Sequence, residues 1–298
     1  MIPPTFAEAY SIGSNYKLRR LTQFSLDDDE PPMNGLVIWE PPRKGFEYVV
    51  GVDPSWGLGE DRAAIHVMRK GTIQALDTQV AEFCTDTMNV HELTPICYMI
   101  GNLYKDEVED VEALMSVECN MSDDIVFRLR NDYNYGNIFI RKKYDNITHQ
   151  YSNQLGWKTD LRTRPLIISK GIHYVKQDWW DLSSPWLFNE LQTIEKKRKD
   201  DDRIRDRIEA AAGAHDDLAM AAFIALWSAH DMEFNEFGTT EELAKQRDRR
   251  DTGHLQAYEA APQKPLSERR DFINTPCSAE DAESFDSLSE IFDDYKNW

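Results

Sequence analysis

The segment that most restricts the fold is HDDLAMAAFIALWSAH, residues 215–230, because it is rich in alanine and apolar on almost every side. A helix that is hydrophobic all round has to be buried, so this segment predicts a central helix within a sizeable core. Gly213 and the acidic pair Asp216 and Asp217 mark its start. Acidic residues at a helix N-terminus interact favourably with the helix dipole and are also typical N-caps.

Short apolar runs alternate with helical patterns before this segment. Residues 46–54, FEYVVGVDP, predict a buried strand that ends at Asp53, and the runs on either side of Gly71 predict an antiparallel hairpin after it. Residues 91–107 predict a helix, and EALMSVECN then predicts a strand with Glu118 near its end. Strands interleaved with helices, without any repeat of roughly 20–50 residues, predict a mixed α/β sheet flanked by helices.

The segments between Glu118 and the last helix carry weaker patterns. Residues 121–132 predict a helix capped by Ser122, and residues 183–200 predict a helix capped by Ser184. The run RPLIISKGIHYVKQ fits either a helix or a strand. Before it lie a strand candidate, residues 137–143, and a segment of loops or a hairpin, residues 145–165.

The net charge of −19, from 34 Lys and Arg against 53 Asp and Glu, argues against a protein that coats nucleic acid through its overall field. The charge is uneven. Residues 230–298 hold 8 basic and 17 acidic residues and few apolar ones, which predicts a flexible acidic tail. Residues 125–177 hold 10 basic and 3 acidic residues, which fits either a solvated face or a local surface for phosphates.

Composition also indicates the cellular compartment in which the chain is found. No stretch approaches the roughly 18 consecutive apolar residues of a membrane span, and the polar start lacks a signal-peptide core, so we expect a soluble cytosolic chain. The four cysteines form no C-x-x-C pair, which predicts reduced thiols and argues against structural zinc.

Four acidic residues stand at the ends of apolar elements, namely Asp53, Glu118, Asp216 and Asp217. If the first and fourth strands are neighbours, one edge of the sheet presents Asp53 and Glu118, and the last helix can direct its acidic pair there. Carboxylates so close would repel one another and their pKa values would rise unless cations neutralise them. Magnesium prefers such oxygen ligands, and two ions about 3.5–4 Å apart can clamp both oxygens of a phosphodiester displacement.

Each carboxylate taken singly also has a structural interpretation. An aspartate before proline, as at Asp53, is a common turn residue, and either Asp216 or Asp217 can simply cap the helix. Glu118 has less structural reason to be there, because an unpaired carboxylate at the end of a buried strand is costly.

Four stretches carry a resemblance to a known family. In order they are YVVGVDPSWGLGEDRAA, SVECN, LGWKTDLRTRPLIISK and EAAAGAHDDLAMAAFIAL. Together they resemble the nuclease domain of the large terminase subunit of tailed bacteriophages, a member of the RNase H-like (retroviral integrase) superfamily. The resemblance implies an RNase H-like mixed sheet flanked by helices over residues 47–229.

The resemblance also implies an activity and a site. It implies a DNA endonuclease that cuts concatemeric viral DNA during genome packaging, with two Mg²⁺ or Mn²⁺ ions. Asp53, Glu118 and one or both of Asp216 and Asp217 would be the catalytic metal ligands, and Asp61 would be a supporting acidic residue. Candidate contacts to DNA phosphates are Arg141, Lys142, Lys143, Lys158, Arg162, Arg164 and Lys170.

The chain departs from a complete large terminase in one respect. No G-x-x-x-x-G-K-[ST] sequence occurs, so the phosphate-cradling loop of an ATPase is missing. Residues 1–46 look like a connector from a missing ATPase half, and we expect no ATP hydrolysis. The partners that the resemblance implies are double-stranded viral DNA, the ATPase half, the small terminase subunit and the portal, in the cytoplasm of an infected host cell and without a membrane.

Two other interpretations stay open at this point. Another RNase H-like nuclease, such as a Holliday-junction resolvase, would share the carboxylates and the last helix. A non-enzymatic packaging module would instead use its acidic surface to bind the portal or the small terminase, and its carboxylates would be dispensable.

Overall fold

The structure is a computed structural model, and it describes residues 7–12, 18–22, 24–59, 61–72, 75–106, 108–145, 150–197, 207–211 and 213–230. Contacts divide the chain into two units, and apart from Thr72 and Ala75 the described residues all belong to the first. The predicted acidic tail, residues 230–298, lies outside the described residues beyond His230.

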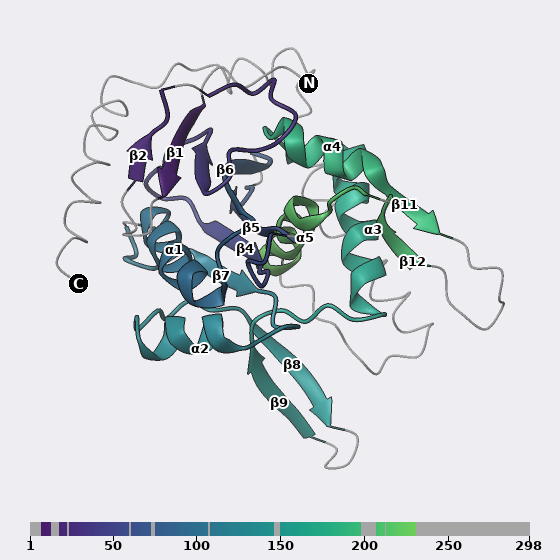
Figure 1. Cartoon of the computed structure of the whole chain (residues 1–298). Coiled ribbons are helices and arrows are strands. Elements are labelled where there is room, and N and C mark those ends of the chain that lie inside the picture. The colour runs from purple at the N-terminus through teal and green to yellow at the C-terminus, as the bar shows by residue number, and fades with distance from the viewer. Residues whose placement is uncertain are drawn as a thin grey trace. The chain divides into compact units, whose positions relative to one another are not determined.

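The centre of the first unit is a sheet of eight strands (Figure 1). Its order is β2-β1-β3-β6-β5-β4-β7, with β10 paired to β6. The central β4 and β5 are almost wholly buried, because their residues are apolar on both faces. The strands are β1 (Glu8–Ile12), β2 (Leu18–Arg20), β3 (Gly35–Ile38), β4 (Tyr48–Asp53), β5 (Ala63–Arg69), β6 (Asp77–Thr85), β7 (Leu114–Val117) and β10 (Trp180–Asp181).

The pairing confirms the predicted fold class of a mixed α/β sheet flanked by helices. Strands β4, β5 and β6 run antiparallel in succession, as the predicted hairpin requires, whereas β4 and β7 are parallel. Residues 1–46, expected to be a connector, contribute β1, β2 and β3 to the same sheet, because β3 pairs with β6. The described part of that segment is therefore hydrogen-bonded to the domain, and its proposed origin as a connector stays a prediction.

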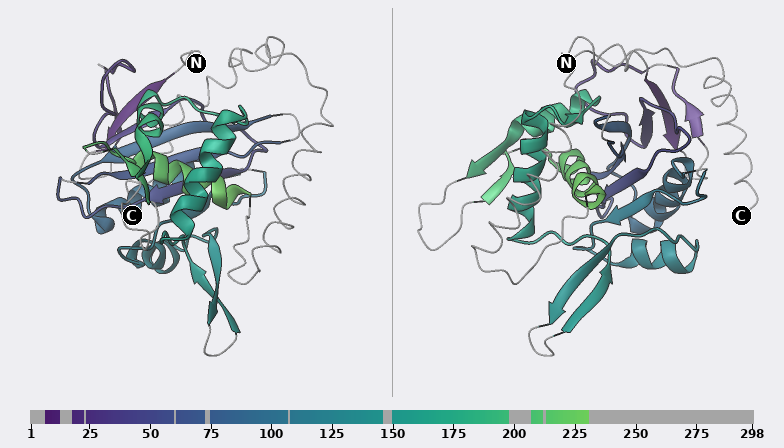
Figure 2. Two further views of the ribbon diagram at one scale, coloured as in Figure 1. Left: turned by 90° about the vertical axis from the view of Figure 1, so that its right-hand side faces the viewer. Right: turned by 180° about the vertical axis from the view of Figure 1, so that it is seen from behind.

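Helix α5 (Asp217–Ala229) is buried from its second residue to its end, as its composition predicts. It contacts β4 and β5 on one side and α3 (Thr163–Lys176) and α4 (Pro185–Thr193) on the other, so it lies between the sheet and these two helices (Figure 2). Gly51 of β4 allows this close approach: a Cβ there would lie 2.0 Å from the carbonyl oxygen of Ala221.

Helices α1 (Val90–Leu103) and α2 (Asp124–Asn131) lie on the side of the sheet away from α5 (Figure 2). Asn89 and Glu92 form a capping box at the start of α1. The prediction that Ser122 caps α2 is wrong, because Asp123 occupies the N-cap position and the Ser122 hydroxyl accepts from the Asp124 amide at 3.0 Å.

Two other predicted elements differ from the structure. Helix α4 starts after Ser184 as predicted, but it ends at Thr193, because the chain then becomes extended as β11 (Ile194–Lys197) and pairs with β12 (Arg207–Ala210). The strand expected at residues 137–143 is β8 (Ile140–Asp145), which leaves the main sheet and forms a separate hairpin with β9 (Gln150–Leu155). The ambiguous stretch before α4 is the helix α3.

In the part of the chain that the structure describes, none of the helices has the length and apolar character needed to cross a membrane.

Candidate functional site

The parallel pairing of β4 and β7 brings two carboxylates to one edge of the sheet. Val52 pairs with Val117, so Asp53 and Glu118 follow side by side, and the Glu118 amide donates to the Val52 carbonyl oxygen at 2.9 Å. The Glu118 side chain lies close enough to raise the pKa of Asp53. Glu118 is 8% exposed and Asp53 is half-buried.

The acidic pair of α5 faces the same edge. Burial first, and then the negative charges of Glu118, Asp217 and Asp216, hold the pKa of Asp53 well above its usual range. Burial and the neighbouring Asp216 raise the pKa of Asp217 to about 6, and Asp61 adds to this rise. The raised pKa values of Asp53 and Asp217 show that positive charge is stabilised at this place.

Arg164 and His215 border the α5 end of this cluster. Asp216 forms an ion pair with Arg164, and Asp217 lies 3.4 Å from Nδ1 of His215. Arg164, predicted as a DNA contact, therefore neutralises one of the acidic residues. His215 and Arg62 favour the charged form of Asp217, although burial outweighs them.

Glu118 is held in place by a side chain that the sequence patterns did not single out. Asn120 donates to Oε1 of Glu118 at 3.2 Å and to the Thr159 carbonyl oxygen at 2.7 Å, and it accepts from the Thr159 amide at 3.0 Å. Thr159 in turn accepts a hydrogen bond from the Trp157 indole at 3.0 Å. The segment after β9 is thus hydrogen-bonded to Asn120, two residues after Glu118. Asn120 is the last residue of the SVECN stretch, so that motif could have drawn attention to it.

Glu190 of α4 is a further carboxylate near the cluster. It is 7% exposed, and burial raises its pKa to about 8 even though the amide of Ala219 donates to it at 2.9 Å. Asp217 and Asp216 contribute to the rise. Its sequence context, a polar position within an amphipathic helix, carries no signal that it reaches the start of α5.

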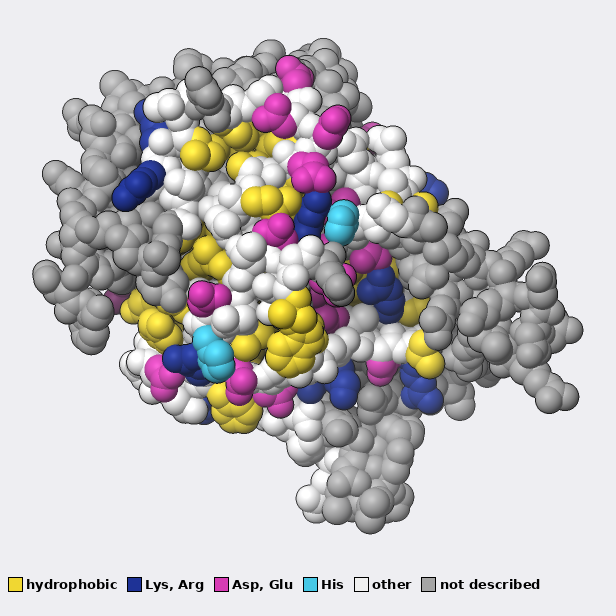
Figure 3. All heavy atoms as spheres, in the orientation of Figure 1, with side chains coloured by type: hydrophobic (Ala, Val, Ile, Leu, Met, Phe, Trp, Pro, Cys, Tyr) yellow, Lys and Arg dark blue, Asp and Glu magenta, His cyan; other side chains and the backbone are white. Residues whose placement is uncertain are grey.

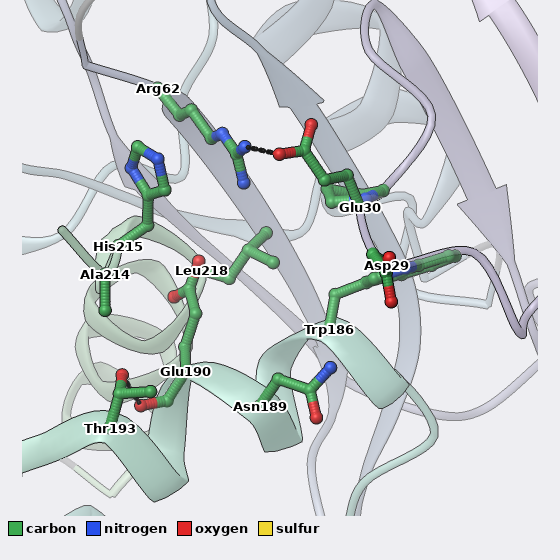
Figure 4. Close-up of a pocket in the computed structure, with 11 residues that line it drawn as sticks. Asp29, Glu30, Arg62, Trp186, Asn189, Glu190, Thr193, Ala214, His215 and Leu218 are labelled. Carbon is green, nitrogen blue, oxygen red and sulfur yellow. Dashed lines mark hydrogen bonds and ion pairs between the residues drawn. The ribbon is translucent and has the colours of Figure 1, made fainter.

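Glu190 also lines a pocket of about 170 Å³ beside the cluster (Figure 4). On one side of this pocket an ion pair joins Arg62 to Glu30 at 3.0 Å. His215 and Leu218 line it at the start of α5. The pocket is therefore lined by the residues on either side of Asp216 and Asp217 in the sequence.

The other basic residues predicted to contact DNA differ in their exposure and in the side chains they contact. Arg141 donates to Oε1 of Gln154 from both Nε and Nη2, at 3.3 and 2.8 Å, and Lys170 lies 5.2 Å from the ring centre of Tyr174. Acidic and basic side chains are interspersed on the face drawn in Figure 3. Exposed basic side chains are found at Lys142, Lys158 and Arg162, whereas the Lys143 side chain lies outside the described residues.

No protein-family profile matches the chain, and a search of curated proteins found no match. Solved structures with a similar arrangement were found. The chain resembles terminase nuclease domains.

These similarities are distant in sequence. The large terminase nuclease of the thermophilic phage G20c is 13% identical with a TM-score of 0.47, covering 67% of this chain and 89% of that one. The large terminase nuclease domain of Thermus phage P74-26 is 13% identical with a TM-score of 0.43, covering 69% and 89%. The human cytomegalovirus terminase nuclease domain, soaked with Mn, is 14% identical with a TM-score of 0.39, covering 61% and 83%.

The donor set of the cluster fits a hard divalent cation by its chemistry. Within the described residues, no group of three or more His, Cys, Asp or Glu side chains is set closely enough to hold a metal ion. The cluster nevertheless offers oxygen ligands alone, and Mg²⁺ and Mn²⁺ prefer carboxylates to nitrogen or sulfur. Residues that could hold such ions are Asp53, Glu118, Asp216 and Asp217.

Proposed function

We propose that this chain is a Mg²⁺- or Mn²⁺-dependent DNA endonuclease of the terminase type, which hydrolyses phosphodiester bonds of concatemeric viral DNA during genome packaging. One observation carries the proposal: Asp53, Glu118 and the acidic pair of α5 converge at one edge of the sheet and raise the pKa of Asp53. Keeping several buried carboxylates charged costs free energy unless a cation neutralises them. A metal-dependent nuclease needs such a cation for its chemistry.

The proposed roles divide among the residues of the cluster. Asp53, Glu118 and one or both of Asp216 and Asp217 would hold two divalent ions, which when bound activate water and stabilise the leaving oxygen. Asn120 keeps the Glu118 carboxyl at the edge of the sheet through the hydrogen bond to Oε1. Arg164 offsets the charge of Asp216, and Asp61 adds negative charge beside Asp217.

The proposed substrate is double-stranded viral DNA in the cytoplasm of the infected cell. Lys158 and Arg162 are exposed on the segment that leads from β9 to α3. Arg164, the second residue of α3, forms the ion pair with Asp216 of the cluster. Phosphate contacts from such side chains hold DNA without reading its sequence. The ATPase half of a terminase, its small subunit and the portal are the proposed partners, on the strength of the sequence motifs alone.

Supercoiled plasmid tests the proposal directly. The chain should nick and linearise the plasmid with Mg²⁺ or Mn²⁺ and stop when a chelator is added. The isosteric variants Asp53→Asn and Glu118→Gln should each lose at least about 100-fold in rate, because each removes a negative ligand that supports several kcal/mol of charge stabilisation. Asp132→Asn is the matched control, since Asp132 is exposed and forms an ion pair with Arg128 of the neighbouring α2.

Unchanged cutting by both active-site variants would contradict the assignment and favour a packaging module whose carboxylates are dispensable. The burial of Glu118 argues against that alternative, because an acidic docking surface has to be accessible to its partner. Faster cutting of a four-way junction than of linear duplex DNA would instead identify a resolvase.

A further inference from the structure

The start of α5 lacks the side-chain cap that its sequence predicts. The first amides of a helix have no partner within the helix, and an aspartate at the N-cap usually accepts from the amide two or three residues later. Asp216 occupies the N-cap position of α5, but its side chain makes no such hydrogen bond. Its carboxylate forms the ion pair with Arg164 instead.

A side chain from another helix supplies the missing cap. The amide of Ala219, the third residue of α5, donates to Oε2 of Glu190 at 2.9 Å. Figure 4 shows Glu190 reaching from α4 toward the start of α5 beside Leu218. Its other oxygen, Oε1, is buried and has no hydrogen-bond partner among the described residues. The hydrogen bond to α5 is therefore the polar contact that Glu190 makes there.

Glu190 is itself on a helix that is fixed to the sheet. Oε1 of Gln79, on β6, accepts from the amides of Ser183 and Ser184 at 2.9 Å each. The Ser184 hydroxyl donates to Oε1 of Glu82, also on β6, at 3.0 Å. Polar contacts thus run from the central sheet to the start of α4, and from α4 to the start of α5.

We propose that Glu190 is a positioning residue, which caps α5 from outside so that the carboxylates of Asp216 and Asp217 stay available to divalent cations. The inference rests on the proposed function. A carboxylate oxygen that accepts a helix amide is turned toward the helix and has less capacity to serve as a metal ligand. By satisfying the Ala219 amide, Glu190 removes that competition and holds the first turn of α5 at a fixed place relative to α4.

Two substitutions separate the hydrogen bond from the charge. Glu190→Ala removes the acceptor, whereas Glu190→Gln keeps a carbonyl oxygen for the Ala219 amide. Mn²⁺ binding is measured by electron paramagnetic resonance, and amide hydrogen exchange is measured for the first turn of α5, at a temperature where every variant is folded. Thr94→Val is the matched control, because it removes one buried side chain–backbone hydrogen bond, from Thr94 to Val90, within α1.

Glu190→Ala should weaken Mn²⁺ binding about 10-fold or more, as loss of a group that orients metal ligands does. It should also speed exchange in the first turn of α5. Glu190→Gln and Thr94→Val should leave both quantities close to those of the wild type. This pattern would support the proposal, since a general loss of stability would not separate Ala from Gln.

Three results would overturn it: unchanged exchange in Glu190→Ala, faster exchange with unchanged Mn²⁺ affinity, or equal losses in Glu190→Ala and Glu190→Gln. The proposed function fails in a different way. A wild-type chain that neither binds Mn²⁺ nor cuts DNA would contradict the nuclease assignment, whereas a wild type that does both, with an equally active Glu190→Ala, would contradict only the positioning role.

Discussion

Gly51→Ala should both destabilise the chain and separate the two halves of the proposed site. Gly51 lies two residues before Asp53 on β4, directly beneath α5, which carries the acidic pair at its start. A Cβ on Gly51 would lie 2.0 Å from the carbonyl oxygen of Ala221 and 2.7 Å from the amide nitrogen of Ala225. Both atoms belong to the helix backbone, so no side-chain rotation can relieve the contact.

The size of the effect follows from these distances. Even to reach 3.0 Å, the closest approach that real Cβ atoms show, α5 has to move away from β4 by about 1 Å. Overpacking a well-filled core costs about 1–3 kcal/mol, and we expect the upper end because the backbone itself has to shift. For a domain of this size that corresponds to a fall of about 6–12 °C in Tm. A displacement of about 1 Å at a catalytic site can also cost about 100-fold in rate.

The assay compares Gly51→Ala with Gly136→Ala. A Cβ on Gly136 would meet its nearest neighbour, Oε2 of Glu112, at 3.8 Å, which is ordinary van der Waals contact. Thermal unfolding and Mg²⁺-dependent plasmid cutting are measured for both, with cutting assayed well below either Tm. A Gly51→Ala variant that unfolds and cuts like Gly136→Ala would refute the close packing of β4 against α5 and the reasoning built on it.

Two further predictions concern the Asn120 side chain and the buried carboxyl group of Glu82. Asn120→Ala should lower the cutting rate about 10–100-fold because Glu118 loses the group that orients it, while Asn102→Ala, which removes a contact within α1, should cut normally in the same plasmid assay. Burial raises the pKa of Glu82 to about 8 from an ordinary 4.5, so the folded chain holds a proton that the unfolded chain releases between those values. Stability should therefore fall as pH rises from 4.5 to 8, with about 4 kcal/mol arising from Glu82. Urea unfolding at pH 5 and pH 8 should show a smaller difference for Glu82→Gln than for wild type, and an equal difference would contradict the buried, protonated state.

Local sequence patterns predicted the elements whose burial is nearly complete. The apolar run before Asp53, the run before Glu118 and the Ala-rich segment after Asp217 each form the strand or helix expected of them. These predictions succeed because periodicity and apolar content reflect the same burial that stabilises the element. Ser184 likewise caps α4 as its chemistry suggests, since a cap depends only on residues a few positions away.

Patterns failed where distant partners decide the outcome. The end of α4 at Thr193 depends on pairing between Ile194–Lys197 and Arg207–Ala210. The pairing of β3 with β6, which brings part of residues 1–46 into the main sheet, was likewise not predicted. Neither contact leaves a local signal, because the partner strand lies outside the segment itself. The residue pattern of a short strand does not show which strand it pairs with.

The sequence by itself determined which carboxylates stand at the ends of buried elements, because apolar runs and the residues that end them are local properties. Only the tertiary structure decided that β4 and β7 are parallel neighbours, so that Asp53 and Glu118 meet at one edge. It also decided that Arg164 pairs with Asp216 rather than facing solvent, and that Glu190 caps α5. Arg164 and Glu190 reach these partners because α5 packs between the sheet and the helices α3 and α4, which brings residues far apart in the sequence together.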